Sequence, residues 1–399
     1  MGRTTFGRGR TLASIRKRTW AAPNGDTKQA WIVDYRDGAG ARRFKQFARR
    51  KDADAWLTQA AWEVSKGVHT ADSQSVTVKE AADIWVKAAE NNDRERGTVE
   101  QYKALRDLHI VPLIGAERLS RLSQPKIEAF RDQLLETRSK AMAAKAVRAL
   151  SRILGEAQRR GLIAQNVARD VKVSRSSRER GRVVIPTKAE LKALIDHADA
   201  GLKPLVMVAI FAGLRASELR GLRWSDIDLK ASTITVAQRA DKYGHIGPPK
   251  SDAGYRTIPI AKALVDELRE WKLACPKGDL GLAFPNSEGG VQDYSHLMKR
   301  RINPLQVKAG VCDPVLVDGK PQLDKKGAPV MRARYGLHSL RHAAASAWIK
   351  QRIDLKRLQT WIGHESIQLT LDTYGHLIAD GEGDAALIEA AQTELMAGA

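Results

Sequence analysis

The sequence has few cysteines, no long hydrophobic run and too few acidic residues to balance its basic ones. Cys275 and Cys312 are its only cysteines, too few for a disulfide framework or a cysteine-based metal site. The longest strongly apolar run, PLVMVAIFAG at 204–213, falls far short of the ~20 residues that a membrane helix needs. The basic N-terminus lacks the apolar stretch of a secretory signal. These absences exclude a secreted disulfide scaffold and a membrane protein, and they predict a cytoplasmic protein.

The shortage of acidic residues leaves a large positive charge. The 399 residues include 67 Lys and Arg against 46 Asp and Glu, which gives a formal net charge of +21. An apolar content of 43% and a charged content of 28% are ordinary for globular proteins and exclude a fully disordered chain. At ~100–200 residues per domain, the length predicts two to four domains. The favoured partner is a polyanion.

Much of this charge lies in residues 1–50, which hold 13 Lys and Arg against three acids. Partial alternation of apolar and basic residues, interrupted by turn clusters at 23–26 and 37–40, predicts three antiparallel strands. A helix is expected from Asp52 to about Lys66. Such clustering is typical of phosphate binding, although a solvated basic tail is the alternative. We predict a DNA-binding domain over 1–70, with the candidate contacts Arg16, Lys17, Arg18, Arg42, Arg43 and Lys45.

The next unit, expected over 75–172, has the pattern of a helical domain. Capping-box sequences at Thr77–Glu80 and Thr98–Gln101 precede apolar runs of helical period. A long helix from about Lys140 to Arg160 carries several basic residues and no acid before Glu156. A basic helix face is usually solvated, but in so cationic a chain we predict DNA contact by Lys140, Lys145, Arg148 and Arg152.

A third unit is expected over 186–380. A capping box at Thr187–Glu190 opens it, and helical patterning resumes across 203–222. Residues 232–260 combine β-rich runs with turn residues and predict a short antiparallel sheet, after which helices return. Residues 311–336, rich in Gly, Pro and Lys, predict an inserted loop or hairpin.

Two further segments complete the expected organisation. Residues 173–185 are rich in Ser and Arg and predict an exposed linker. Residues 381–399 contain acids but no Lys or Arg, and an apolar stripe of helical period predicts a tail helix. The predicted fold class is multidomain and mainly α with small β-sheets (α+β): a small sheet with a helix, a helical domain, and a mixed α/β domain.

Four short segments of the third unit carry side chains suited to phosphate chemistry: AGLRASEL, PPKSDAGYRTIPI, LHSLRHAAAS and WIGHESIQLTLDTYGHL. Arg215 and Glu218 are three residues apart and are therefore expected on one helix face. Taken alone, each segment is a weak signal, because a single histidine or tyrosine is usually structural. The candidate residues are Arg215, Glu218, Lys250, His338, Arg341, His364 and Tyr374.

Together and in this order, these residues resemble the catalytic signature of the tyrosine recombinases, specifically phage integrases of the lambda type. The resemblance covers most of the chain and implies an arm-type DNA-binding domain at 1–70, a core-binding domain at 75–172 and a catalytic domain at 186–380. It implies that Arg215 and Arg341 clamp a phosphate, that Lys250 is the hairpin lysine and that Tyr374 is the nucleophile. His338 and His364 match the family's two histidines, and Glu218 a supporting acidic position.

The sequence departs from the family pattern at a few positions near these residues. Ser339 stands where Asp is frequent, Ala343 where Thr is frequent, and Trp361 where Leu is frequent. None of these replacements removes a catalytic group.

The chemistry of phosphodiester cleavage supports these roles independently. Arginines offer bidentate, charge-assisted donors that match phosphate oxygens, and they act most strongly on the charge of the transition state. A phenol with a pKa near ~10 needs nearby cations or a histidine to act as a nucleophile, and a lysine is a reasonable acid for the leaving 5′-oxygen. The sequence has no GK[ST] loop and no two-metal carboxylate cluster, so we predict neither metal nor cofactor.

The predicted function is site-specific DNA recombination: integration or excision of phage or mobile-element DNA through a 3′-phosphotyrosine and a Holliday junction. Two alternatives remain: an enzyme of the same chemistry, such as a type IB topoisomerase or a resolvase, and a catalytically silent DNA-binding regulator. The resemblance implies double-stranded DNA with core-type and arm-type attachment sites as partner, and a homotetramer on that DNA. It also implies a DNA-bending host factor and an excision directionality factor.

Overall fold

The computed structural model describes residues 13–23, 26–36, 41–65, 74–174 and 184–378, with three residue pairs at 388–389, 392–393 and 396–397. The chain divides into two compact units, Met1–Arg180 and Gly181–Ala399. The predicted linker at 173–185 and tail helix at 381–399 lie outside the described residues, apart from a few positions. Within the described ranges, no helix is both long and apolar enough to cross a membrane.

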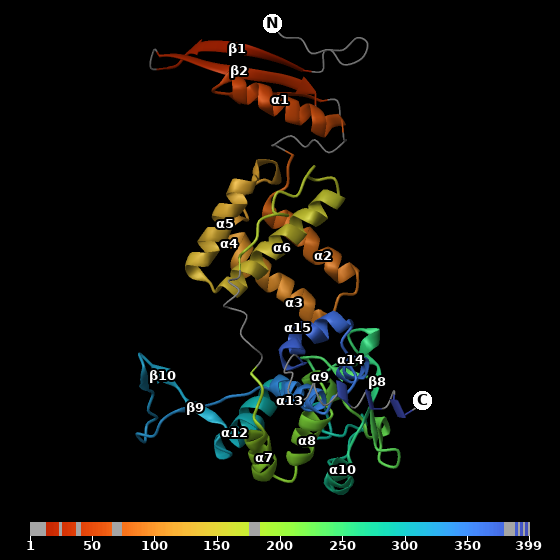
Figure 1. Cartoon of the computed structure of the whole chain (residues 1–399). Helices are drawn as coiled ribbons and strands as arrows, with labels where there is room; N and C mark the ends of the chain where they lie inside the picture. Colours follow the sequence, from red (N-terminus) through yellow and green to blue (C-terminus); the bar gives the residue numbers. More distant parts are fainter. Residues whose placement is uncertain are drawn as a thin grey trace. The chain divides into compact units, whose positions relative to one another are not determined.

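The first unit begins with the predicted three-stranded antiparallel sheet. Its strands are β1 (Ala13–Ala21), β2 (Thr27–Arg36) and β3 (Arg42–Phe47), in that order across the sheet. Helix α1 (Arg50–Ser65) lies along one face, as Figure 1 shows. Val33 of the central strand pairs with Ile15 and Lys45 on either side. Val33, Tyr35 and Ala53 form the buried centre of this small core.

The pleat of this sheet separates the predicted DNA-contacting residues into two sets. Side chains alternate between the two faces of a strand, and Val33 and Tyr35 mark the face that packs on α1. Lys17, Arg43 and Lys45 pair in register with residues of that face. The opposite face carries Arg16, Arg18 and Arg42, all three exposed.

The same unit continues as a helical bundle with a core of its own. Its main helices are α2 (Val78–Asn91), α3 (Arg96–Leu105), α5 (Gln124–Thr137) and α6 (Lys140–Arg159), and short helical turns that include α4 (Val111–Ile114) join α3 to α5. Thr77 and Glu80 form the predicted capping box of α2. The predicted box at Thr98 is wrong, because α3 begins at Arg96 and Thr98 lies inside the helix.

Helix α6 has one face in the core of the helical bundle and one basic face in solvent. Its buried face is made of small and aliphatic residues that include Ala146, Leu150 and Leu154, a stripe of helical period that fits against the neighbouring helices. The opposite face leaves four cations exposed: Lys140, Lys145, Arg148 and Arg152.

The second unit contains helices around a small antiparallel sheet of order β4-β5-β8. The sheet strands are β4 (Ile227–Asp228), β5 (Thr233–Val236) and β8 (Arg256–Pro259), and β6 (Arg239–Ala240) pairs with β7 (Ile246–Gly247). The helices that hold its core are α7 (Lys188–His197), α8 (Lys203–Phe211), α9 (Ala216–Gly221), α10 (Lys262–Ala274), α11 (Tyr294–Leu297) and α12 (Asn303–Lys308). Three more follow: α13 (Leu337–Lys350), α14 (Leu355–Ile362) and α15 (Ile367–Ile378).

The insert predicted at 311–336 is a hairpin. Strand β9 (Cys312–Pro314) pairs with β12 (Met331–Ala333), and β10 (Leu316–Val317) pairs with β11 (Lys320–Pro321). The capping box at Thr187 is present at the start of α7. The mainly helical architecture with small antiparallel sheets confirms the predicted α+β fold class.

Candidate active site

A break between two helices sets the position of Arg215. The sequence pattern predicts continuous helix over 203–222, but α8 ends at Phe211 and α9 begins at Ala216. Gly213 in the break has a φ of +60°, and a Cβ there would meet Ala344 at 3.1 Å, so glycine suits both the conformation and the space. The break makes Arg215 the N-cap of α9.

Glu218 links Arg215 to a second arginine. Its carboxylate accepts hydrogen bonds from the Arg215 backbone N–H at 2.8 Å and from its Nη1 at 2.7 Å. It also accepts two from the Arg256 guanidinium, at 2.8 and 3.1 Å. Burial raises the pKa of Glu218, but the charge and hydrogen bonds of Arg256 outweigh this effect and lower the pKa to about 2. The buried carboxylate is therefore ionised at neutral pH.

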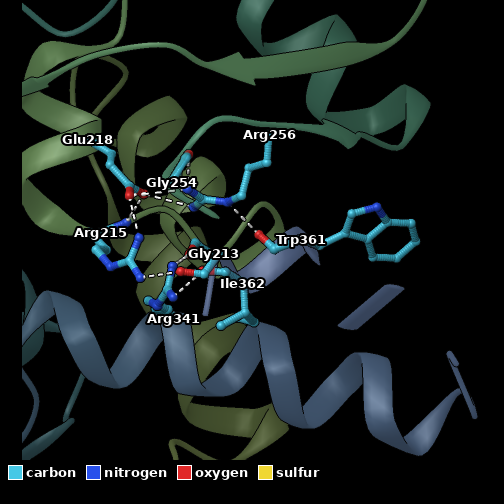
Figure 2. Close-up of polar contacts among 9 residues, drawn as sticks. Gly213, Arg215, Glu218, Gly254, Arg256, Arg341, Trp361 and Ile362 are labelled. Carbon is cyan, nitrogen blue, oxygen red and sulfur yellow. Dashed lines mark hydrogen bonds and ion pairs between the residues drawn. The ribbon is translucent and has the colours of Figure 1, made fainter. Parts of the chain in front are cut away.

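Arg256 is a site residue that sequence reasoning missed. Its side chain has no exposed surface, and beyond Glu218 it donates to the carbonyl oxygens of Gly254 (3.0 Å) and Trp361 (2.7 Å). Figure 2 shows its guanidinium directed toward Glu218 beside Arg215. One signal was available. Arg256 and Ile258 are two residues apart and therefore share the inward face of β8, where a charge needs a buried partner.

Arg341 approaches the same cluster from α13. It is 1% exposed, its Nη1 donates to the Gly213 carbonyl at 2.7 Å, and its Nη2 donates to the Ile362 carbonyl. Burial and the positive charge of Arg215 lower the pKa of the Arg341 guanidinium to about 9. Because Arg215 Nη2 donates to the Gly363 carbonyl at 2.6 Å, both arginines are fixed to the end of α14 (Figure 2).

Three histidines lie around the arginine cluster. His338 and His342 are one turn apart on α13, with their rings edge to face at 4.6 Å. His364 follows α14, and its Nδ1 lies 3.0 Å from Thr370 Oγ1. Burial, joined by the nearby positive charges, lowers the pKa of His342 and of His364 to about 4 and lowers that of His338 as well. All three imidazoles are thus neutral at physiological pH.

Tyr374 on α15 contacts two of these histidines. Its side chain has no exposed surface, its hydroxyl lies 2.7 Å from His342 Nδ1, and its ring is parallel to that of His364 at 6.3 Å. Burial raises the pKa of the phenol to about 12, although Arg341 acts in the other direction. Sequence reasoning missed His342, whose spacing of four from His338 places both on one helix face.

Lys250 is the one candidate residue that does not contact the others in the described part of the chain. It is exposed in the loop between β7 and β8, and no hydrogen bond joins it to the arginines in the described part of the chain. Six of the seven candidate residues, all but Lys250, therefore come together with Arg256 and His342. Over the described ranges, no three His, Cys, Asp or Glu side chains are grouped as a metal site requires, and metal-free chemistry stays a prediction.

Residues 186–380, which contain the whole cluster, match the phage integrase family. The catalytic unit belongs to this family of tyrosine recombinases. The chain is 25% identical over 383 residues to a XerC-like tyrosine recombinase of Caldanaerobacter subterraneus, covering 86% of this chain and 90% of the relative. It is also 25% identical to the prophage integrase IntR of Escherichia coli, over 76% of this chain and 77% of the relative. The recombinase is thus an enzyme of site-specific DNA recombination, as predicted.

Solved structures share its fold. The Tn1549 transposon integrase bound to transposon right end DNA matches with a TM-score of 0.63 and 19% identity, over 79% of this chain and all of that one. A lambda integrase tetramer bound to a Holliday junction matches with a TM-score of 0.55 and 19% identity, over 87% of this chain and 95% of that one. At this identity the likeness concerns the fold alone.

Proposed function

We propose that the recombinase integrates and excises mobile DNA by transesterification at Tyr374. The Tyr374 oxygen attacks a phosphodiester, the bond from phosphorus to the 5′-oxygen breaks, and the enzyme holds a 3′-phosphotyrosine. A 5′-hydroxyl of the partner duplex then attacks this linkage, and Tyr374 leaves as the phenol. The energy of the broken bond is kept in the phosphotyrosine, so no nucleotide is consumed. The observation that carries this proposal is the convergence of Arg215, Arg341, His338 and His364 on one tyrosine.

The arginine cluster is suited to stabilising the added negative charge of the transition state. Glu218 and backbone carbonyls fix the guanidinium planes of Arg215 and Arg341, and each arginine has more N–H groups than these contacts use. Arg215 is about one-third exposed, at 34%, and can therefore meet a phosphate. Donors fixed before the reaction cost little reorganisation during it.

Proton transfer completes the proposed chemistry. We assign Lys250 as the acid that protonates the leaving 5′-oxygen, because it lies on an exposed loop and carries a proton to give. The neutral imidazoles of His338 and His364 are suited to hydrogen bonding with the phosphate. Arg256 of β8 holds the Glu218 carboxylate in place, and Glu218 in turn fixes Arg215.

The remaining units supply DNA contacts in this proposal. The face of the N-terminal sheet away from α1, with its exposed Arg16, Arg18 and Arg42, would bind arm-type sites, and the basic face of α6 would bind core-type sites. A homotetramer would hold two duplexes during exchange, as the lambda integrase tetramer on a Holliday junction suggests. A DNA-bending host factor and an excision directionality factor remain proposed partners.

Covalent capture of DNA tests the function. Duplexes selected from a randomised pool by binding are resynthesised with a nick beside each phosphate in turn, so that cleavage releases a short fragment and traps the adduct. We expect an adduct on a denaturing gel, with peptide mass spectrometry placing the DNA on Tyr374. The Tyr374→Phe variant should bind without forming it, whereas Tyr294→Phe, an exposed tyrosine of the same unit, should react normally. Adduct formation by Tyr374→Phe would refute the assignment.

A further inference from the structure

The hydroxyl of the nucleophile is held by a residue outside the predicted catalytic set. Tyr374 Oη lies 2.7 Å from His342 Nδ1, a distance typical of a good hydrogen bond. The Tyr374 ring packs among Ala345 of α13 and Leu358 and Ile362 of α14. With no exposed surface, the phenol in this position is closed to a phosphodiester. It must leave before it can attack DNA.

The direction of this hydrogen bond follows from the protonation states. The phenol of Tyr374, with a pKa near 12, keeps its proton at neutral pH. The neutral imidazole of His342 can accept that proton's hydrogen bond at Nδ1 while Nε2 carries the ring hydrogen. We therefore assign the phenol as the donor and His342 Nδ1 as the acceptor, which stabilises the unreactive phenol rather than the phenolate.

We propose that His342 is a positioning residue that holds Tyr374 in a buried storage position and thereby limits how often the nucleophile is available. The inference rests on the proposed function, since it takes Tyr374 as the nucleophile. Three polar or aromatic contacts define the position: the hydrogen bond to His342, the edge-to-face contact of the His342 and Tyr374 rings at 5.6 Å, and the parallel stacking on His364.

The position of His338 suggests how DNA opens this arrangement. The His338 ring also contacts the His342 ring, edge to face at 4.6 Å, and His338 is exposed whereas His342 is half-buried. A phosphate that binds His338 would therefore reach the ring that holds Tyr374 through a single contact. In this arrangement, DNA binding and release of the nucleophile are coupled through two neighbouring imidazoles on α13.

The first test measures access to Tyr374 without DNA. The full-length protein is treated with a tyrosine-selective diazodicarboxamide reagent, and the labelling rate at each tyrosine is followed by peptide mass spectrometry. Tyr335 is the internal control, because it is also buried and its hydroxyl bonds to Glu190. The His342→Leu variant should raise the ratio of Tyr374 to Tyr335 labelling about fivefold, the factor that corresponds to one net hydrogen bond. An unchanged ratio would overturn the proposal, and general loosening of the fold cannot imitate a rise because it affects both tyrosines.

A conservative variant separates the hydrogen bond from the packing of the ring. The amide of Asn can place an acceptor close to the position of Nδ1, so His342→Asn should return the labelling ratio toward that of the wild type. If Asn and Leu raise the ratio equally, the hydrogen bond is not what holds Tyr374 and the proposal fails.

The second test measures cleavage of the nicked duplex under single-turnover conditions. Because storage withholds the nucleophile, His342→Leu should form the adduct several-fold faster than the wild type at saturating DNA. Slower cleavage would mean that His342 assists the chemistry and would overturn the storage role. A wild-type protein that labels as expected but forms no adduct at Tyr374 would instead refute the proposed function, so the two failures are distinguishable.

Discussion

Arg42 on the N-terminal sheet is 61% exposed, whereas the side chain of Arg256 in the catalytic unit has no exposed surface. Both are paired with a carboxylate, Arg42 with Asp34 and Arg256 with Glu218. The Arg42 guanidinium lies largely in water, and a pair with such a solvated partner contributes little to folding. The stability of the buried pair depends on both partners, because removal of either one leaves a buried charge with neither solvent nor a counter-charge.

The comparison teaches that the chain uses arginine in two ways. On the sheet and on α6, the cations that we propose to contact DNA are exposed, and contributions of this kind to phosphate binding are largely interchangeable. Around Glu218, each guanidinium is held by named oxygen atoms, and its value lies in its orientation. Substitutions that preserve charge but change shape should therefore be harmless in one region and severe in the other.

The largest expected effect comes from replacing Arg215 or Arg341 with lysine. Each change keeps the charge but loses the planar donors that reach the carbonyls of Gly363, Gly213 and Ile362. We expect single-turnover cleavage of the nicked duplex to fall by orders of magnitude with little change in DNA binding. The matched control is Arg269→Lys, at an exposed arginine of α10. Wild-type rates in both site variants would contradict the orientation argument.

The next effect concerns the stability of the catalytic unit. Glu218→Gln leaves the buried Arg256 without its counter-charge, and we expect a loss of about 3–5 kcal/mol in the free energy of unfolding. The exposed carboxylate of Asp266 also pairs with an arginine, and Asp266→Asn should lower the free energy of unfolding far less, because an ion pair in water contributes little. Urea unfolding followed by hydrogen exchange in α13 gives both values. Equal losses would remove the distinction between buried and exposed pairs.

The sequence predicted the features of the fold that depend on local signals. The helix starts at Thr77 and Thr187 were predicted correctly. A capping box is formed by two residues only three apart, so the sequence alone can indicate it. The box at Thr98 failed because α3 begins three residues earlier than that box requires, with N-cap Glu95 and no side-chain cap. Such local preferences are weak, and the burial of Val99 and Leu105 is compatible with the earlier start.

The parts that sequence reasoning missed depend on partners far away in the chain. Arg256 is a site residue because Glu218 and Trp361 lie beside it in space, at separations of 38 and 105 residues. His342 matters because Tyr374, 32 residues later, returns to it. Alternation along β8 and the spacing on α13 could have marked both residues as inward-facing, but only the fold identifies what they face.

A smaller effect is the loss of stability that the site histidines should cause as the pH falls. The pKa values of His342 and His364 are about 4 in the folded protein, against 6.5 in an ordinary environment. Below pH 6.5 the unfolded chain therefore binds protons that the folded chain does not, so stability should fall from pH 6.5 to 4 and be flat above pH 6.5. Glu218 adds its own loss only below pH 4.5.

Unfolding of the catalytic unit measured across this pH range checks the sign. His364→Asn should reduce the slope between pH 6.5 and 4, because it removes one of the histidines whose pKa is lowered in the folded protein. Stability that rises as the pH falls through this range would show that the site histidines are charged in the folded protein.

The smallest expected effect tests the two faces of the N-terminal sheet. Arg16 and Arg18 lie exposed on the face away from α1, whereas Lys45 lies on the α1 side, with its ammonium 4.8 Å from the Trp56 ring centre. If the open face contacts phosphates, Arg16→Ala and Arg18→Ala should each weaken binding of the full-length protein to a mixed-sequence duplex. Each should also reduce the slope of log K against log salt by about 0.9, the value for one phosphate contact. Lys45→Ala should leave that slope unchanged and lower the stability of the sheet and α1, because a cation over an aromatic ring contributes to packing. An equal loss of slope in all three variants would show that DNA binding does not distinguish the faces, and the proposed arm-binding surface would then have to include both.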